Sequence, residues 1–306
     1  MRDWLTFWNS PHAIYVNDHH RDVHYRDVAL EIRSLIPSRS ATVVDYGCGD
    51  TTAAHLVAEA AAALILSDGA PGVREALAAR FKDNRKIAVR APEEVAALPP
   101  ASADLIVLNS VAQYLTRGEL DRLLALFRRL LGRDGRLVVG DVIPPHTTAA
   151  TEIMALLALA WRNGFVGAAL MGLARTLFSD YRVLRKRLGL THYTEAEMLE
   201  VLAKAGFAAR RRYPNLEHNQ ERMTFVAVPA EHAAERNVGS RSHASGTHEH
   251  RVCEMFPPWP WVPARECASM PDNRDSQSWA APTVSAMAAP RAPSGFSPPI
   301  VLSRAV

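Results

Sequence analysis

The segment VVDYGCGDT, residues 43–51, places an acidic side chain just before two glycines that are one residue apart. Gly47 and Gly49 permit a tight turn and let backbone N–H groups approach a ligand closely. The helix expected after this turn would direct its positive end toward an anionic group such as a carboxylate. Asp45 would complement a positive group. The segment therefore suits a ligand that carries both signs of charge close together.

A second acidic side chain follows at a characteristic separation. Asp68 lies 68 − 47 = 21 positions after Gly47 and closes a short apolar run. A carboxylate at about this separation commonly accepts hydrogen bonds from ribose hydroxyls in nucleotide-binding α/β folds. Together the two segments predict a pocket for a nucleoside that also carries an amino-acid tail.

These residues can meet only if a sheet brings their loops together. Residues 38–142 alternate short apolar runs with helical patterns, which indicates βαβ units and a parallel sheet. The runs are mostly continuous, as expected for strands covered on both faces. We expect strands at 41–45, 63–67, 86–90, 103–109 and 135–141, followed by two more near 208–213 and 223–228. Ligands of such open sheets bind beyond the carboxyl ends of the strands, where the strand order reverses.

Two helices have predictable ends. Thr116 and Glu119 form a capping-box pair ahead of an apolar face of period 3.6, and Gly132 is expected to close that helix. Thr194 repeats the device, with Glu197 three residues later. Gly206 is placed to stop the second helix in a left-handed cap.

Residues 147–190 are long, helical and apolar. Arg162, Asn163 and Arg175 interrupt the apolar run, so a helical cap over the ligand edge is favoured over an interfacial membrane segment. Its large apolar side chains suggest a hydrophobic or aromatic small acceptor; these are Trp161, Phe165, Met171 and Phe178. Packing on the sheet or a dimer contact explains them equally well.

Residues 1–37 are expected to form one or two helices over the ligand. Tyr15, His20, His24 and Tyr25 are candidates to contact ligand or substrate. His20 and His24 have the i, i+4 spacing that metal sites use, and His19 lies beside them. Because no carboxylate-rich motif accompanies them, a packing or solvated role is favoured and no metal site is predicted.

Composition limits the class of protein. Lys and Arg exceed Asp and Glu by only 35 − 32 = 3, which does not indicate a nucleic-acid partner. Three scattered cysteines exclude a disulfide framework or a zinc cluster and favour a reducing cytoplasm. The first residues do not resemble a signal peptide. Residues 231–306 are rich in proline and lack periodicity, so a disordered tail is expected, with a Pro-rich docking peptide at Trp259 and Trp261 as the less favoured interpretation.

The ordered series of motifs resembles class I S-adenosylmethionine-dependent methyltransferases over residues 38–230. VVDYGCGD resembles the first motif of that family and DGAP, residues 68–71, the second. ADLIVLNSVAQYL, residues 103–115, is similar to the fourth. LLGRDGRLVVGD and HYTEAEMLEVLAKAGF are similar to the segments around the fifth strand and before the sixth. The resemblance implies a Rossmann-like, doubly wound, mostly parallel seven-stranded sheet with an antiparallel last strand, and S-adenosylmethionine as cofactor.

The resemblance also implies a role for individual residues. Asp45, Gly47 and Gly49 would hold the methionine part of the cofactor and Asp68 its ribose. An acid after the third strand usually faces the adenine, and Glu93 is preferred over Glu94. Asn109 and Ser110 would line the methionine and methyl side, and Cys48 and Gly69 complete the set of cofactor-binding residues.

One position departs from the family pattern. The third glycine of the first motif falls at Thr51, whose hydroxyl could cap the following helix. We expect altered detail rather than lost cofactor binding.

The implied activity is transfer of a methyl group to a small, apolar or aromatic molecule. Such an in-line displacement uses an activated electrophile, so alignment supplies much of the catalysis, up to roughly 7–11 kcal/mol in favourable systems. His146 or His192 could reach a hydroxyl acceptor, but each is equally consistent with an ordinary loop residue, so no catalytic base is assigned.

Two alternatives to this activity stay open. One is a non-catalytic, regulatory protein that binds S-adenosylmethionine. The other, less favoured, is a nicotinamide-dependent oxidoreductase, whose glycine fingerprint would need glycine or alanine at Thr52. The sequence does not predict the oligomeric state.

Overall fold

The structure is a computed structural model that describes residue 9 and residues 15–176 and 189–231. Phe178 and the predicted tail, from residue 232 onward, lie outside the described residues. So do Trp259 and Trp261 of the Pro-rich segment, and most of the first 14 residues. The expectations for those parts of the chain remain predictions.

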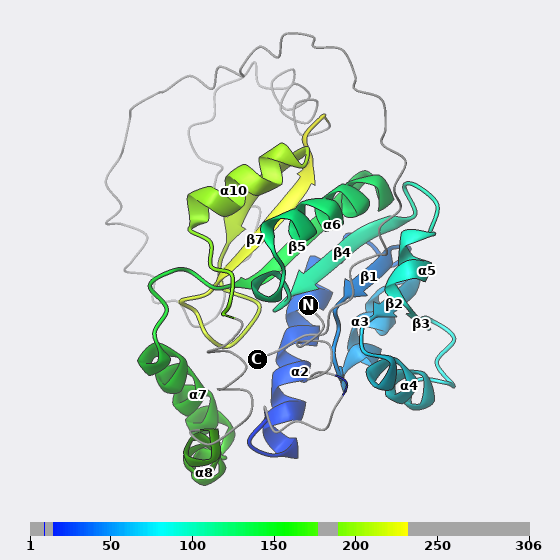
Figure 1. Ribbon diagram of the computed structural model, residues 1–306. Coiled ribbons are helices and arrows are strands. Elements are labelled where there is room, and N and C mark those ends of the chain that lie inside the picture. Colours follow the sequence, from blue (N-terminus) through cyan, green and yellow to red (C-terminus); the bar gives the residue numbers. More distant parts are fainter. Residues whose placement is uncertain (1–8, 10–14, 177–188, 232–306) are drawn as a thin grey trace, which may run out of the picture. The chain divides into compact units, whose positions relative to one another are not determined.

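A seven-stranded sheet forms the centre of the fold, in the order β3-β2-β1-β4-β5-β7-β6 (Figure 1). Its strands are β1 Thr42–Tyr46, β2 Ala63–Ser67, β3 Ile87–Arg90, β4 Ala103–Asn109, β5 Leu131–Val142, β6 Phe207–Arg212 and β7 Met223–Pro229. The pairs among β1 to β5 are parallel, whereas β7 runs antiparallel to both β5 and β6. The predicted Rossmann-like sheet with an antiparallel last strand is confirmed.

Helices cover both faces of this sheet because neighbouring strand residues point to opposite sides. Val43 of β1 packs in the core that contains α2, α3 and α4, whereas Val44 packs in the core that contains α5, α6 and α10. Both side chains are fully buried. The helices are α2 Asp18–Leu35, α3 Ala54–Ala60, α4 Pro71–Arg80, α5 Pro92–Ala96, α6 Arg117–Leu130 and α10 Glu195–Lys204.

The predicted helix starts are confirmed. At α6, the Thr116 hydroxyl accepts the Glu119 N–H at 3.3 Å, and the Glu119 carboxylate accepts the Thr116 N–H at 2.8 Å. The same capping box opens α10 at Thr194, and Gly206 follows that helix at φ +83°. These caps fix where α6 and α10 begin, and therefore where β5 and β6 follow.

The predicted end of α6 at Gly132 is wrong. The helix ends at Leu130, and Leu131 is already extended and pairs with Ala103 of β4. Gly132 therefore lies inside β5, which is twelve residues long and begins earlier than expected. The helix therefore ends where Leu131 pairs with β4, and not at a glycine cap.

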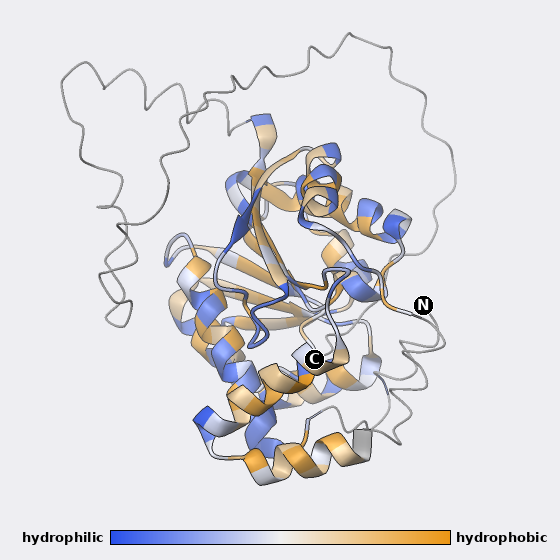
Figure 2. Cartoon of the chain, turned by 90° about the vertical axis from the view of Figure 1, so that its left-hand side faces the viewer, coloured by the Kyte–Doolittle hydropathy of each residue, from blue (hydrophilic) through white to orange (hydrophobic). Residues whose placement is uncertain are grey.

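The helical insertion comprises α7 Ala149–Asn163 and α8 Val166–Thr176, separated by Gly164 at φ +75°. Both helices are rich in hydrophobic residues (Figure 2). Phe165 and Leu159 pack with Val23 of α2 in a small cluster apart from the sheet's two cores. In the part of the chain that the structure describes, every helix is too short or too polar to cross a bilayer.

Candidate functional site

The carboxyl ends of β1, β2 and β4 meet at one edge of the sheet. Asp45 of β1 pairs with Leu66 of β2 on one side and with Val107 of β4 on the other. From β1 the sheet continues to β2 and β3 on one side and to β4 and β5 on the other. The carboxyl ends of β1 and β4 therefore form the switch point at which ligands of such folds bind. The loops that carry Asp45, Asp68 and Asn109 therefore lie together, as predicted.

The glycine loop after β1 folds tightly against the end of β2. Gly47 and Gly49 have φ of +73° and +60°, a region that L side chains rarely adopt. The N–H groups of Gly47 and Cys48 donate to the Ser67 carbonyl at 2.7 and 3.0 Å. The Cys48 side chain is fully buried in the α2 side of the core. Cys48 is thus placed to support the loop by packing.

Asp68 joins the two cofactor loops. One of its carboxylate oxygens accepts the Gly49 N–H at 2.9 Å and the other accepts the Ala70 N–H at 2.8 Å. Arg74 in turn donates to the Gly69 carbonyl at 2.9 Å. Asp68 and Asp45 are both buried at this edge. Both carboxylates therefore lie near the glycine loop, whose Gly47, Cys48 and Gly49 N–H groups already donate to acceptors within the protein.

The expected helix cap by Thr51 is wrong. α3 begins only at Ala54, after Ala53, and no side chain caps its first turn. Thr51 is instead buried, and its carbonyl accepts a hydrogen bond from Arg80 at 3.3 Å. The helix therefore begins two residues later than a cap at Thr51 would have placed it, because the Thr51 side chain packs inward.

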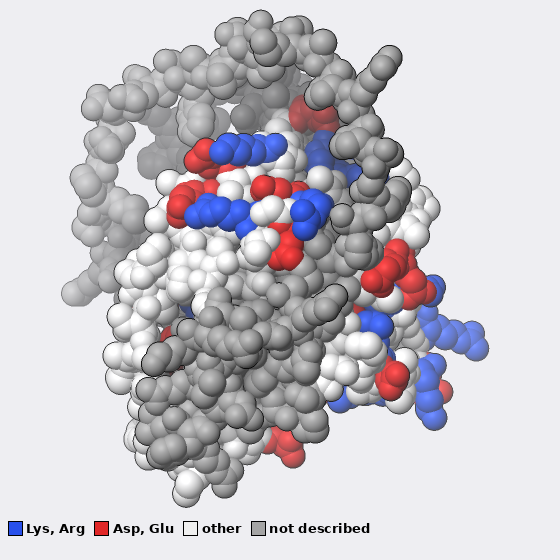
Figure 3. Space-filling model, viewed as in Figure 1, with Lys and Arg blue, Asp and Glu red and all other residues white. Residues whose placement is uncertain are grey.

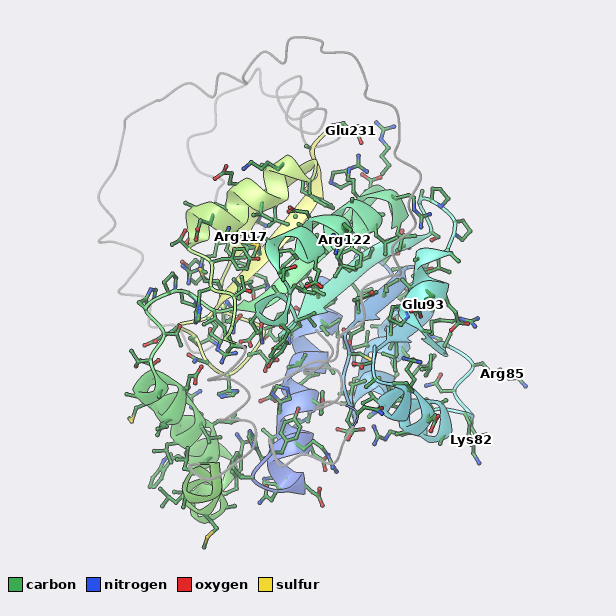
Figure 4. The ribbon with its side chains drawn as sticks, in the orientation of Figure 1. Lys82, Arg85, Glu93, Arg117, Arg122 and Glu231 are labelled. Carbon is green, nitrogen blue, oxygen red and sulfur yellow. The ribbon has the colours of Figure 1, made fainter. Side chains whose placement is uncertain are left out.

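The two acids that compete for the adenine position differ in their surroundings. The Glu94 carboxylate accepts the Ala91 N–H at 2.7 Å and contacts Arg90 at 3.2 Å. The Ala91 N–H, followed by Arg90, lowers the pKa of Glu94. Glu93 is exposed at the start of α5, beside β3 (Figure 4). Both acids are exposed, and the preference for Glu93 over Glu94 stays a prediction.

The ends of β4 and β5 hold two residues in strained backbone conformations. Ser110 and Asp141 have φ of +56° and +59°, which costs energy for any residue other than glycine. The Ser110 hydroxyl donates to the Asp141 carboxylate at 2.8 Å. Both residues are buried, as is Asn109. Such strain is typical of functional sites, and here it directs two polar side chains toward each other.

A glutamate from the loop between β6 and β7 completes this cluster. One Glu217 oxygen accepts a hydrogen bond from the Asn109 amide at 2.6 Å and lies 3.1 Å from the Ser110 hydroxyl, whose single proton points to Asp141 at the shorter distance. The other Glu217 oxygen lies 3.0 Å from the Nδ1 atom of His24 on α2. The side chains of His24 and Glu217 are each about 3% exposed, so the contact is shielded from water.

Arg222 links the cluster to the helical insertion. Its guanidinium contacts the Asp141 carboxylate and lies 2.9 Å from the Glu152 carboxylate of α7. Burial raises the pKa of Asp141 to about 6, and Arg222 opposes that shift. The guanidinium in contact with Asp141 thus favours the charged form of this carboxylate.

Two further histidines are held neutral near Glu217. Burial, followed by the charge of His24, lowers the pKa of His20 to about 3. Burial also lowers the pKa of His218 to about 4, although the Glu217 carboxylate opposes the change. The His20 ring stacks on Phe165 at 5.1 Å between centroids, and Tyr15 meets it edge-on at 5.4 Å.

The sequence analysis singled out the residues after β1 and β2 and missed most of the polar cluster at the ends of β4 and β5. The polar segment 214–221 joins the last two strands, yet four of its residues are buried; these are Asn215, Leu216, Glu217 and Asn219. The density of amide, acidic and histidine side chains in PNLEHNQE was the signal that could have found them. His146 and His192, considered as possible bases, are both exposed.

An open groove of about 710 Å³ adjoins the cluster. Thr151, Ala155 and Leu159 of α7 line one side, and His218 and Glu221 line another. His218 thus lies both in the lining of the groove and beside Glu217.

Comparison with known proteins identifies the domain. The family described as a methyltransferase domain matches residues 44–139. No curated protein matches the chain.

Solved structures of similar fold include the pyocyanin biosynthetic protein PhzM, at 20% identity over 66% of this chain and 54% of that one, with a TM-score of 0.45. The YcgJ protein of Bacillus subtilis matches at 16% identity over 61% and 70% of the two chains, with a TM-score of 0.44. A SAM-dependent methyltransferase of Leishmania major matches at 14% identity over 74% and 81%, with a TM-score of 0.47. The match thus spans about half the length of the pyocyanin protein.

The matched segment contains the glycine loop, Asp68, Glu93 and the Asn109–Ser110 pair. The sheet around it has the order and the antiparallel last strand that the motifs implied. Residues 44–139 are therefore similar to a methyltransferase domain, and they lie within the seven-stranded sheet that the resemblance implied.

Proposed function

We propose that the chain transfers a methyl group from S-adenosylmethionine to a small molecule whose reacting atom lies beside Asn109 and Ser110. The observation that carries this proposal is the division of the sheet edge. Glycine backbone and two aspartates lie at the ends of β1 and β2, and a buried polar cluster lies at the ends of β4 and β5. The first part suits the cofactor and the second suits an acceptor.

The residues on the cofactor side would bind it in a defined direction. Asp45 and the glycine loop would hold the amino-acid end, Asp68 the ribose and Glu93 the adenine. When bound, the cofactor supplies a methyl group that is already activated. The task of the protein is then alignment and exclusion of water. The burial of Asp45, Asp68 and Asn109 supports this arrangement.

The acceptor is proposed to have a polar reacting end and an apolar or aromatic body. Phe165 and Tyr15 pack against the His20 ring, close to the polar cluster, and support an apolar body. Trp161 is 80% exposed and does not support the acceptor role expected for it. The groove along α7 offers alanine and leucine side chains beside His218.

A small acceptor is favoured over a nucleic acid. On the face shown in Figure 3, basic and acidic side chains alternate over α6 and α10. Arg117 pairs with Glu197 at 3.1 Å, and Lys204 with Glu200 at 2.6 Å. A nucleic-acid surface would instead present concentrated basic residues without such partners.

The proposal is tested by incubating the protein with S-adenosylmethionine and a metabolite extract. Mass spectrometry should find a small molecule that gains one methyl group. With that acceptor, Phe165→Leu should raise KM for the acceptor several-fold while leaving cofactor affinity unchanged. Trp161→Leu is the matched control on the exposed side of α7 and should leave both unchanged. Equal loss of acceptor and cofactor binding in Phe165→Leu would contradict a role in the acceptor site.

A further inference from the structure

We propose that His24, Glu217 and His218 form a binding site for a divalent first-row transition-metal ion. Each residue offers one ligand atom, and these atoms lie within 4.8 Å of one another. They come from α2 and from the loop between β6 and β7, so no local motif contains them. The carboxylate that was missing beside the N-terminal histidines in the sequence is supplied by a residue almost two hundred positions later.

The spacing of two of the ligand atoms fits a shared ion. The His24 Nδ1 atom and a Glu217 oxygen are 3.0 Å apart. Two ligands bound at about 2.1 Å and roughly at right angles around one ion are separated by about 3 Å. Some ligand atoms of the set lie up to 4.8 Å apart. A shift of about 1 Å would bring them to a common ion with bonds of about 2.1 Å. His218 can make such a shift because it is only half-buried and lies in a loop.

The Glu217 carboxylate is already oriented for coordination. The oxygen that faces away from His24 accepts a hydrogen bond from the Asn109 amide at 2.6 Å. Hydrogen bonds of this kind fix the direction of a ligating carboxylate and are a regular feature of metal sites. The second oxygen is thereby held toward the histidines.

The charge of the buried cluster favours a cation. Asp141, Glu152 and Glu217 contribute three carboxylates, whereas Arg222 contributes one guanidinium that is already shared by Asp141 and Glu152. Glu217 is thus the carboxylate that faces the histidines rather than the arginine. These carboxylates attract a bound cation, whereas they would repel an anion.

The donor set and its access indicate the type of ion. Two imidazoles and one carboxylate suit Zn²⁺, Mn²⁺ or Fe²⁺, whereas Mg²⁺ and Ca²⁺ prefer oxygen ligands. His218 lines the groove along α7, so an ion could enter from solvent. Three protein ligands leave coordination positions open on that side, as catalytic sites do.

The open positions would hold a polar group of an acceptor that enters through the groove along α7. This role rests on the proposed function, because it assumes that the groove admits the acceptor. The metal site itself does not depend on methyl transfer and is measured separately.

The experiment uses the full chain after dialysis against a chelator. Co²⁺ is added, and its visible absorption is recorded for the wild type, His218→Leu and Glu217→Gln. The wild type should show the intense bands of a histidine-bound ion, with one ion more per chain than either variant. Zn²⁺ should displace Co²⁺ at that site, and His218→Leu should weaken the site at least tenfold. His146→Leu is the matched control, since His146 is exposed and lies outside the cluster.

Histidines elsewhere in the chain, such as His243 and His248, make the comparison with variants necessary. Identical Co²⁺ spectra and stoichiometry in the wild type, His218→Leu and Glu217→Gln would overturn the site. Cofactor affinity is measured in parallel, so that loss of folding is recognised. If metal binding is confirmed but its removal leaves acceptor KM unchanged, the proposed role is wrong while the site stands.

Discussion

The two sides of the candidate site are built in different ways. On the cofactor side, Asp68 contacts Gly49, only 19 positions away, and the loops follow neighbouring strands. On the acceptor side, Asn109 contacts Glu217 across 108 positions, and Asp141 contacts Arg222 across 81. The first side depends on local backbone geometry and the second on side chains that only the complete sheet brings together. Substitutions at the carboxyl ends of the strands should therefore change stability by different amounts on the two sides.

The largest expected effect is on the buried ion pairs of the acceptor side. Arg222→Met removes the guanidinium between Asp141 and Glu152 and leaves buried carboxylates unpaired. Breaking such a pair costs about 3–5 kcal/mol in the free energy of unfolding. Denaturant unfolding measures the change. Arg117→Met is the control, since its exposed pair with Glu197 contributes less than about 1 kcal/mol. Equal losses of unfolding free energy in the two variants would show that the buried ion pairs of Arg222 stabilise the protein no more than an exposed pair does.

A smaller effect is expected at Gly140. A Cβ atom there would lie 2.2 Å from the Asn109 side-chain oxygen and 2.6 Å from Leu216. Gly140→Ala should therefore displace the Asn109 amide and destabilise the protein by about 1–3 kcal/mol, as overpacking does.

Gly167 of α8 provides the matched control, because a Cβ atom added there would meet nothing within 4 Å. Gly167→Ala should be neutral or stabilising by up to about 1 kcal/mol. Thermal unfolding of the two variants compares the stability effect of a methyl group at a crowded position with that at an uncrowded one. A neutral Gly140→Ala would mean that Asn109 is not held in place by close packing.

The third expected effect is a dependence on pH that is small just below pH 6.5 and grows as the pH falls. The pKa of His20 is lowered to about 3 in the fold, so the unfolded chain binds a proton there that the folded chain does not. The stability that neutral His20 contributes is present above pH 6.5 and is lost as pH falls toward 3. The slope is about 1.4 kcal/mol per pH unit.

His20→Gln should flatten this part of the stability curve, measured by denaturant unfolding with a chelator present. His19→Gln is the control, because His19 is exposed. An unchanged slope in His20→Gln would show that His20 is not held neutral by the fold.

The same contrast explains what the sequence could predict. Strands 63–67 and 103–109 were predicted with their observed bounds, because they are continuous apolar runs between turn residues. The adjacency of Asp45 and Asp68 followed from parallel pairing of neighbouring strands.

The acceptor side escaped prediction for a physical reason. β7 lies between β5 and β6, and this order brings the 213–222 loop across the ends of β4 and β5. Nothing in the local pattern of Asn109 or Glu217 encodes that pairing. The predicted helix end at Gly132 and the predicted helix cap at Thr51 were also wrong. Strand pairing determined the local structure at the first position, and burial did so at the second.

The central claim is that the glycine loop and the two aspartates bind S-adenosylmethionine at the carboxyl edge of β1 and β2. Calorimetric titration of the full chain with S-adenosylmethionine tests it most directly. One site per chain should appear, Asp45→Asn should weaken it at least tenfold, and the exposed control Asp83→Asn should not. No heat of binding at millimolar cofactor, or equal affinity in all three proteins, would contradict the account.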